Sequence, residues 1–94
     1  MSAEEVRELL LATHAFPGSY TMKVIGAAGD DFVGRVVLAA QHSLARPADI
    51  LHRTRSTPNG EHVSVTLVMH VETPEEIITV YESLQRVQGL KVLM

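Results

Sequence analysis

Cysteine and tryptophan are absent from this 94-residue chain, and aromatic residues make up only 4% of it. The lack of cysteine excludes a disulfide framework, a thiolate nucleophile and a cysteine-ligated zinc site. The longest apolar run, residues 36–40, is far shorter than the roughly 20 residues that cross a bilayer. The acidic start, residues 1–8, also lacks the charged-then-apolar order of a signal peptide. We therefore expect a cytoplasmic protein that makes no use of a membrane.

The length allows one domain, residues 1–94, in which residues 1–15 form an N-terminal helical extension. A chain of this size buries only roughly 65% of the surface that its unfolded form exposes, which leaves little room for a deep active site. The sequence also lacks the G-x-S-x-G, H-E-x-x-H, phosphate-loop and dinucleotide-binding motifs. We therefore expect a protein that is not an enzyme and uses no cofactor.

Charge is unevenly distributed along the chain. Residues 1–34 carry 2 basic and 5 acidic groups, residues 35–60 carry 4 and 1, and residues 61–94 carry 2 and 5. The middle third is therefore basic between two acidic ends. This distribution argues against nucleic-acid binding along the whole chain, but it leaves room for one local contact with an anionic partner.

Hydrophobic periodicity divides the first half into elements. A capping box, Ser2 with Glu5, opens a helix that ends near Thr13. Residues 20–25 alternate as a half-buried strand. Asp30 or Asp31 can cap a second helix. Pro47 ends that helix, residues 49–57 form a second and more polar strand, and the apolar stripe of the helix consists of Val33, Val36, Val37, Ala40 and Leu44.

The second half begins with a turn at residues 57–60, whose Asn-Gly centre favours a two-residue hairpin loop. Residues 61–72 then give the clearest strand, with valine, leucine and methionine at alternate positions. Thr73, Pro74 and Glu76 combine an N-cap, a helix-start proline and an acidic third position. The helix that they open is expected to bury Ile77, Tyr81 and Leu84, with Val87 at its end.

Gly89 ends this helix, and residues 90–94 form a last short strand. After the leading helix, the order is strand, helix, strand, strand, helix, strand. This α+β order is the ferredoxin-like βαββαβ sandwich. It predicts a four-stranded antiparallel sheet with the first and third strands in the middle, two helices on one face and the other face open.

The arginines fix the register of the central hairpin. A two-residue loop puts Arg53 opposite Thr66 and Arg55 opposite Ser64 on the open face. A slip by one residue would turn both arginines toward the helices, where unpaired buried charge is too costly. The open face is then expected to carry Lys23, Ile25, Arg53, Arg55, His62, Ser64, Thr66, Val68, His70, Lys91 and Leu93.

This basic face is the candidate interaction surface. Charge on an edge strand can simply prevent sheet-to-sheet pairing; alternatively, the face binds an anionic small molecule, an acidic protein surface or nucleic acid. The central strands lack the aromatic rings on which RNA readers of this topology stack bases, which argues against nucleic acid. Ile25, Val68 and Leu93 form an apolar centre that could support a homodimer. The candidate interaction residues are Lys23, Arg53, Arg55, Ser64, Thr66 and Lys91.

The five histidines do not predict a metal site. His62 and His70 share a face but are separated by about 26 Å along an extended strand, against zinc–nitrogen bonds of about 2 Å. Ser64 lies near His62, but no acidic residue is placed to orient that histidine, so a catalytic triad is not supported either.

The turn from Gly26 to Asp31 is a second candidate site. Backbone N–H groups at the start of the following helix can bind an anion or a carboxylate, and glycines allow a ligand to approach the backbone closely. The alternative is a tight strand-to-helix turn that needs glycine only for its positive φ.

Several separated motifs occur in order from Glu8 onward. They are Phe16-Pro17, Tyr20-Thr21-x-Lys23-Val24-Ile25-Gly26, Val36-Val37, Ser56-x-x-x-Gly60-x-x-x-Ser64-Val65 and Tyr81-Glu82-x-Leu84. Together with the terminal apolar strand, they resemble the YbeD-like family of small bacterial proteins of unknown function. The resemblance implies a ferredoxin-like fold similar to the ACT regulatory domain, and a regulatory role without an established activity. It also implies a ligand site at the first strand-to-helix turn, often at a subunit interface, formed here by Gly26, Gly29, Asp30 and Phe32.

From these observations we expect a non-catalytic regulatory or adaptor module that acts in trans by binding a partner protein or a small metabolite. Nucleic-acid binding through Lys23, Arg53, Arg55 and Lys91 is the alternative.

Overall fold

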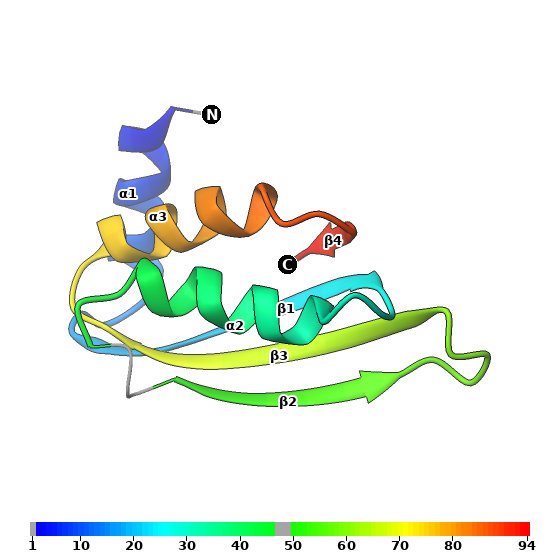
Figure 1. Cartoon of the computed structure of the whole chain (residues 1–94). Helices are drawn as coiled ribbons and strands as arrows, with labels where there is room; N and C mark the ends of the chain where they lie inside the picture. The colour runs from blue at the N-terminus through cyan, green and yellow to red at the C-terminus, as the bar shows by residue number, and fades with distance from the viewer. Residues whose placement is uncertain (1, 47–49) are drawn as a thin grey trace.

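The computed structural model describes residues 2–46 and 50–94, which form three helices and a four-stranded sheet (Figure 1). The strand order is β2-β3-β1-β4 and every pairing is antiparallel, so the predicted α+β ferredoxin-like fold is confirmed. The expected helix end at Pro47 and strand start at Asp49 lie outside the described residues. The elements are α1 (Ala3–Thr13), β1 (Gly18–Ala27), α2 (Phe32–His42), β2 (Leu51–Ser56), β3 (His62–Val71), α3 (Pro74–Gln85) and β4 (Leu90–Leu93).

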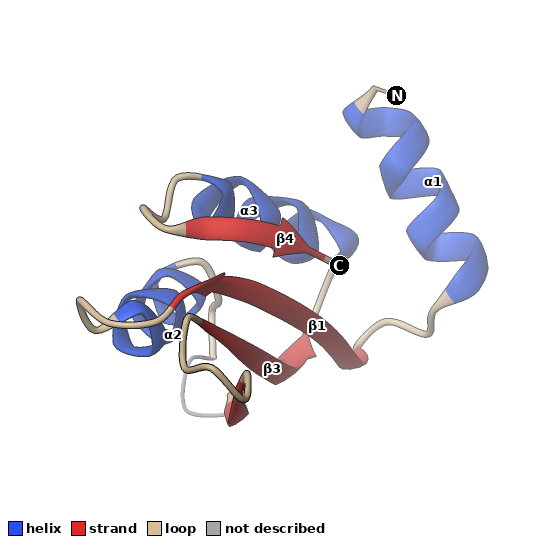
Figure 2. Cartoon of the chain, turned by 90° about the vertical axis from the view of Figure 1, so that its right-hand side faces the viewer, coloured by secondary structure: helices blue, strands red, loops and turns tan. Residues whose placement is uncertain are grey.

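Helices α2 and α3 lie side by side over one face of the sheet (Figure 1). Helix α1 packs against α3 and stands apart from the strands (Figure 2). Leu10 is the buried residue of α1, whereas Leu9 is 54% exposed. The core therefore lies between α2, α3 and the covered face of the sheet, and α1 adds Leu10 to it, with Val6 partly buried against it.

Strand β3 carries the largest share of this core. Its odd-numbered residues, from Val63 to Val71, are at most 7% exposed, and its even-numbered residues are half-buried on the opposite face. Burying one such aliphatic side chain stabilises the fold by roughly 1.5–3 kcal/mol. The alternation predicted from the sequence is therefore the pattern that fixes which face the helices cover.

One of the three predicted helix caps forms as expected. The Glu5 backbone N–H donates to Ser2 Oγ over 3.2 Å. Asp31 precedes α2, but with its backbone in the left-handed region its side chain makes no capping hydrogen bond. Thr73 precedes α3 and also makes no side-chain cap; the Glu76 backbone N–H donates to the Thr73 carbonyl over 3.2 Å instead. The Glu76 carboxylate accepts from the backbone N–H of Glu72, outside the helix, over 2.6 Å.

The buried faces of the helices differ slightly from the predicted stripes. In α3, Val80 is fully buried, and Tyr81, predicted as core, lies half-buried at the groove between α3 and α1. In α2, Phe32 joins Val36 and Ala40 in the core, and the predicted Val33 and Val37 lie at its margin. A helix on a flat sheet buries a narrower stripe than hydrophobicity alone indicates, so apolar residues at its edges remain partly exposed.

The β2–β3 hairpin has the predicted register, but its loop is not the predicted two-residue turn. Arg53 pairs with Thr66 and Arg55 with Ser64. The loop spans four residues, 58–61, because the His62 N–H donates to the Thr57 hydroxyl while the Thr57 carbonyl accepts from Gly60. A four-residue loop pairs the same residues as a two-residue loop with the same centre, so the register is unchanged.

The side of the sheet to which Leu93 in β4 points was predicted wrongly. Leu93 pairs with the fully buried Val24, so it faces the helices rather than the open side. Val92 pairs with Ile25 and takes the predicted place of Leu93 on the open face. The reason is a shift of register between Ile25 and Gly26, a β-bulge that breaks the simple alternation.

Candidate functional site

The open face of the sheet presents three rows of side chains that run across the strands. Residues directly opposite each other in an antiparallel pair lie on the same face, so the pairings on both sides of β3 define each row. The middle row places the Thr66 hydroxyl between two cations, and the next row places Ser64 between Arg55 and an apolar pair. The rows are Leu51–Val68–Thr21, Arg53–Thr66–Lys23 and Arg55–Ser64–Ile25–Val92.

Three cations on this face are unpaired. The side chains of Lys23, Arg53 and Arg55 are exposed and make no ion pair or hydrogen bond with any residue in the described part of the chain. Neighbouring strands are about 4.8 Å apart and alternate residues about 7 Å apart, so the Cα atoms of the three cationic residues lie within roughly 12 Å of one another. Like charges this close, with no carboxylate between them, give the face a positive potential.

A shallow depression of about 300 Å³ lies at this group of cations. Its lining consists of Lys23, Arg53, Thr54, Arg55, Ser64 and Thr66. Five of these six were predicted as interaction residues, and the structure brings them together. Lys91, the sixth predicted residue, is exposed in β4, but the bulge leaves it without a ladder partner, so it stands outside the three rows.

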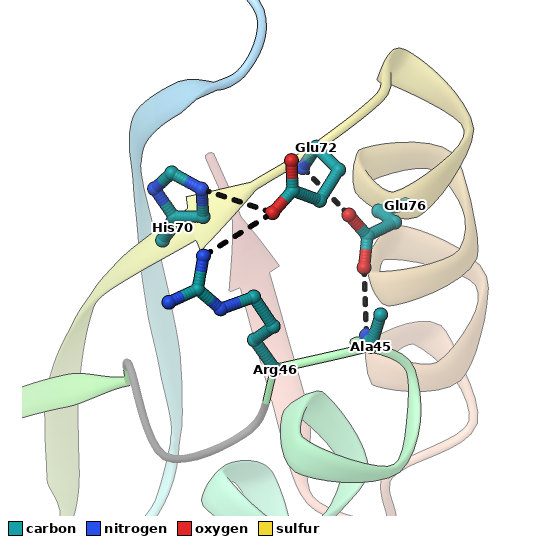
Figure 3. Close-up of polar contacts among 5 residues, drawn as sticks. All are labelled: Ala45, Arg46, His70, Glu72 and Glu76. Atoms are coloured by element: carbon teal, nitrogen blue, oxygen red, sulfur yellow. Dashed lines mark hydrogen bonds and ion pairs between the residues drawn. The ribbon is translucent and has the colours of Figure 1, made fainter.

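One end of the open face is closed by a polar cluster (Figure 3). Glu72 lies just beyond β3. Its Oε1 is 3.2 Å from His70 Nε2 and 3.4 Å from Arg46 Nη1. The Glu76 carboxylate joins the segment after α2 to the start of α3, because it accepts the backbone N–H of Ala45 over 2.8 Å as well as that of Glu72. The carboxylate at the end of the face is thus already neutralised and leaves the positive charge of the rows uncompensated.

The predicted site at the turn from Gly26 to Asp31 is closely packed on the side that faces the core. The Phe32 ring is 1% exposed and lies directly under Gly26, where a Cβ atom would overlap it. Gly26 therefore serves the packing of α2 on β1. Both residues were assigned to the ligand site by the family resemblance, and both lie in the core.

The backbone of the same turn takes three left-handed residues in succession: Gly29, Asp30 and Asp31, with φ of 96°, 51° and 53°. Arg35 holds this conformation in place, because its Nε donates to the Asp30 carbonyl over 3.0 Å and its Nη1 to the Gln88 carbonyl over 2.7 Å. The predicted need for positive φ at this turn is therefore met, and a cationic side chain crosses the turn to the segment before β4.

A depression of about 260 Å³ opens beside this turn. Gly29 and Asp30 line it together with Arg35, which sequence reasoning missed. A cation in the first turn of a helix opposes the helix dipole, and that signal could have marked Arg35 as a residue held by other contacts. The Asp31 carboxylate lies against Gly34, where it covers the start of α2 and opposes the anion predicted to bind there.

The described residues offer no desolvated catalytic group. No charged or polar residue among them is buried, and no three histidine, aspartate or glutamate side chains converge as metal ligands. Burial raises the pKa of Tyr20 above its ordinary value of about 10, and neighbouring Tyr81 adds to the effect. An upward shift favours the protonated phenol further, so it creates no reactive base. None of the described helices is long and apolar enough to span a membrane.

The fold of this chain is similar to that of a solved ACT domain. The ACT domain of GTP pyrophosphokinase from Chlorobium tepidum superposes with a TM-score of 0.59, covering 81% of this chain and 94% of that domain. The two sequences are 13% identical, so the likeness concerns the fold alone.

The sequence comparison identifies the family. The model of a family described as "Protein of unknown function (DUF493)" matches residues 12–94. The UPF0250 protein of Shewanella halifaxensis is 38% identical over 76 residues, which are 81% of this chain and 84% of that protein. The UPF0250 protein of Buchnera aphidicola is 29% identical over 79 residues, 84% of this chain and 88% of its own. The chain therefore belongs to the DUF493/UPF0250 family, which agrees with its resemblance to the YbeD-like proteins.

Proposed function

We propose that this chain is a non-catalytic regulatory or adaptor module that acts in trans by binding an acidic surface of a partner protein to its open sheet face. The observation that carries the proposal is the group of three unpaired cations, Lys23, Arg53 and Arg55, around a depression that no helix covers. An acidic partner would neutralise these charges, and electrostatic complementarity would steer its approach.

The surroundings of the cations favour a protein over other occupants. Ile25, Val68 and Val92 add half-exposed apolar area beside the charges, as in protein interfaces with an apolar centre and a polar rim. Single-stranded nucleic acid would need stacking platforms, and the only rings among the open-face residues of the described strands are His62 and His70. A second copy placed face to face would bring like charges together.

A non-catalytic role is supported by the exposure of the ionisable groups. Enzymes shift the pKa values of their acids and bases by burial and close charge pairs. Here the charged side chains of the described residues stay at the surface. The depression on the open face is shallow and solvent-facing, which suits a macromolecular contact better than a reaction that must exclude water.

A small metabolite at the Gly29–Asp31 turn is the second candidate, favoured by the depression of about 260 Å³ beside Arg35. A ligand there would have to present a hydrogen-bond acceptor to Arg35 without placing an anion beside Asp31. Thermal-shift screening of amino acids and nucleotides tests this candidate, because a ligand that prefers the native state raises the melting temperature. Loss of the shift in Asp30→Asn, with no loss in Arg53→Gln, would assign the ligand to the turn.

The main proposal can be tested by cross-linking inside the cell. A photoreactive amino acid is placed at Thr66, in the middle of the cation group, and in a control protein at Thr79, an exposed position on α3. Adducts are analysed for protein, nucleic acid and small molecules. We expect a protein adduct at Thr66 that is absent at Thr79 and strongly reduced by Arg53→Gln with Arg55→Gln.

A control neutralisation, Arg86→Gln, removes one positive charge at an exposed position beyond α3 and should leave the adduct unchanged. The proposal is wrong if Thr66 yields no adduct beyond the Thr79 background, or if its adducts are nucleic acid.

A further inference from the structure

Strand β2 forms an edge of the sheet, and its outer backbone groups bond to no residue that the structure describes. In an antiparallel ladder, alternate residues direct both their N–H and C=O toward the partner strand. The Thr57 N–H donates to the His62 carbonyl over 2.9 Å, which sets the phase: residues 51, 53 and 55 face β3. His52, Thr54 and Ser56 therefore direct three N–H and three C=O groups away from the sheet.

Both faces of β2 are also accessible. All six of its residues are exposed, including Leu51 at 70%, because α2 and α3 cover β1 and β3 but do not extend over β2. An added strand would thus meet no side chains of the helical layer. The edge has the length of an ordinary strand, about five to six residues.

The positive charges of Arg53 and Arg55 decide which strands can pair with this edge. Two copies of β2 paired about a two-fold axis at Thr54 would place Arg53 of each copy opposite Arg55 of the other. An axis at Arg53 or at Arg55 would place that arginine opposite itself. Like charges directly opposite each other destabilise a strand pair. The same arginines stabilise an incoming strand that carries carboxylates, so they favour an acidic partner and disfavour these three self-pairings.

We propose that the partner segment recognised by this protein is an extended acidic peptide that adds as a fifth strand to the free edge of β2. Its acidic residues occupy alternate positions, i and i+2, so that both lie on the open-face side opposite Arg53 and Arg55. Its backbone pairs with His52, Thr54 and Ser56. This inference rests on the proposed function, since it specifies how the acidic partner is bound.

The periodicity of the strand makes the proposal specific. Residues two apart share a face and residues three apart do not. Two peptides of about eight residues, with the same composition in a background of valine and threonine, can therefore carry their two aspartates either two apart or three apart. Net charge is identical, so a difference in affinity reports the pairing geometry. We expect the three-apart peptide to bind about fivefold more weakly, through loss of one cross-strand ion pair.

The backbone contact has its own signature. The outward amide protons of His52, Thr54 and Ser56 should exchange rapidly with solvent in the free protein and become protected when the two-apart peptide binds. The inward amides of Arg53 and Arg55 are already bonded to β3 and should change little.

One substitution tests the backbone pairing at the edge without changing the charges of Arg53 and Arg55. Thr54→Pro removes an outward N–H without removing a bond to β3, because proline is tolerated on an edge strand where its nitrogen faces solvent. We expect Thr54→Pro to bind the two-apart peptide at least about tenfold more weakly, and the matched Thr54→Ala to bind normally. Retained protection of the β3 amides verifies that the proline variant is folded.

The outcomes distinguish this inference from the proposed function. Equal affinity for the two peptides, or binding without protection of the three outward amides, overturns strand addition. If the cellular adduct at Thr66 also persists in Thr54→Pro, the partner binds the face and not the edge, so the proposed function survives alone. If that adduct is absent from the wild-type protein as well, the proposed function fails and the inference fails with it.

Discussion

The ten residues of β3 alternate between two faces of the sheet, and these faces differ in burial and in polarity. On the covered face, Leu67 and Val65 are fully buried beneath the helices. On the open face, Thr66 is half-buried between two cations, and Ser64 is half-buried between Arg55 and Ile25. The covered face is held by packing, which tolerates little change in shape. The open face contributes little packing, so its residues are free to recognise a partner.

The largest expected effect is the loss of a covered-face side chain. Leu67→Ala should lower the free energy of unfolding by about 2–5 kcal/mol, since it leaves a cavity in the centre of the core. Val68→Ala, the next residue on the open face, should cost less than about 1 kcal/mol because its side chain is already half solvated. Urea denaturation measures both. Similar losses at the two positions would contradict the assignment of the faces.

A smaller loss is expected where the covered face of β1 meets α2. Gly26→Ala would place a methyl group into the Phe32 ring and should cost about 1–3 kcal/mol. The double variant with Phe32→Leu tests the cause: if the clash is responsible, the combined loss is less than the sum of the two single losses. Additive losses would show that Gly26 acts through another contact.

Loss of a contact in the polar cluster at the end of the open face should have an intermediate effect on stability. Glu76→Gln replaces one carboxylate oxygen with an N–H donor, so either the Glu72 or the Ala45 backbone N–H loses its acceptor. We expect a loss of about 1–3 kcal/mol. Glu75→Gln is the control, because it removes the same charge from an exposed ion pair with Arg7, worth at most about 1 kcal/mol. Equal losses in urea denaturation would mean that the Glu76 contacts do not contribute to stability.

The smallest effect on stability belongs to the open-face cations. Arg53→Gln and Arg55→Gln should change the free energy of unfolding by no more than about 0.5 kcal/mol each, since neither makes an ion pair with a described residue. The same variants should lose the cellular adduct at Thr66. A large loss of stability would place these arginines among the residues that hold the fold, and the contrast between the two faces would fail.

The fold could be predicted because its signals are local and repeated. The alternation along β3, the capping box at Ser2 and Glu5 and the proline at the start of α3 each specify an element without reference to the rest of the chain. The hairpin register was predictable for a different reason: only one register keeps Arg53 and Arg55 out of the core.

What could not be predicted depends on contacts between distant segments. The bulge that turns Leu93 inward is set where β4 meets β1, and nothing in the five residues of 90–94 signals it. Glu76 has capping-box spacing to Thr73, but its carboxylate is taken by Glu72 and Ala45, the latter 31 positions earlier in the chain. Alternation along a strand specifies faces well, but it cannot show which partner a polar group finds.

In the candidate site, too, the residues placed by the strand pattern could be predicted, and the contacts between distant segments could not. Lys23, Arg53, Arg55, Ser64 and Thr66 were predictable because strand order and register place them in adjacent rows. The partners of Arg35 were not predictable, although its charge in the first turn of α2 is a signal that other contacts hold it. Its acceptors are the backbone carbonyls of Asp30 and Gln88, and every residue type has a backbone carbonyl.

The irregularity in β4 has a consequence for how relatives of this chain can vary in length. Lys91 is the surplus residue, opposite no residue of β1. Its deletion would join Leu90 directly to Val92 and leave Leu90 and Leu93 inside and Val92 outside. An alignment gap at this position therefore preserves the inside–outside pattern, whereas a one-residue gap within β3 would invert it.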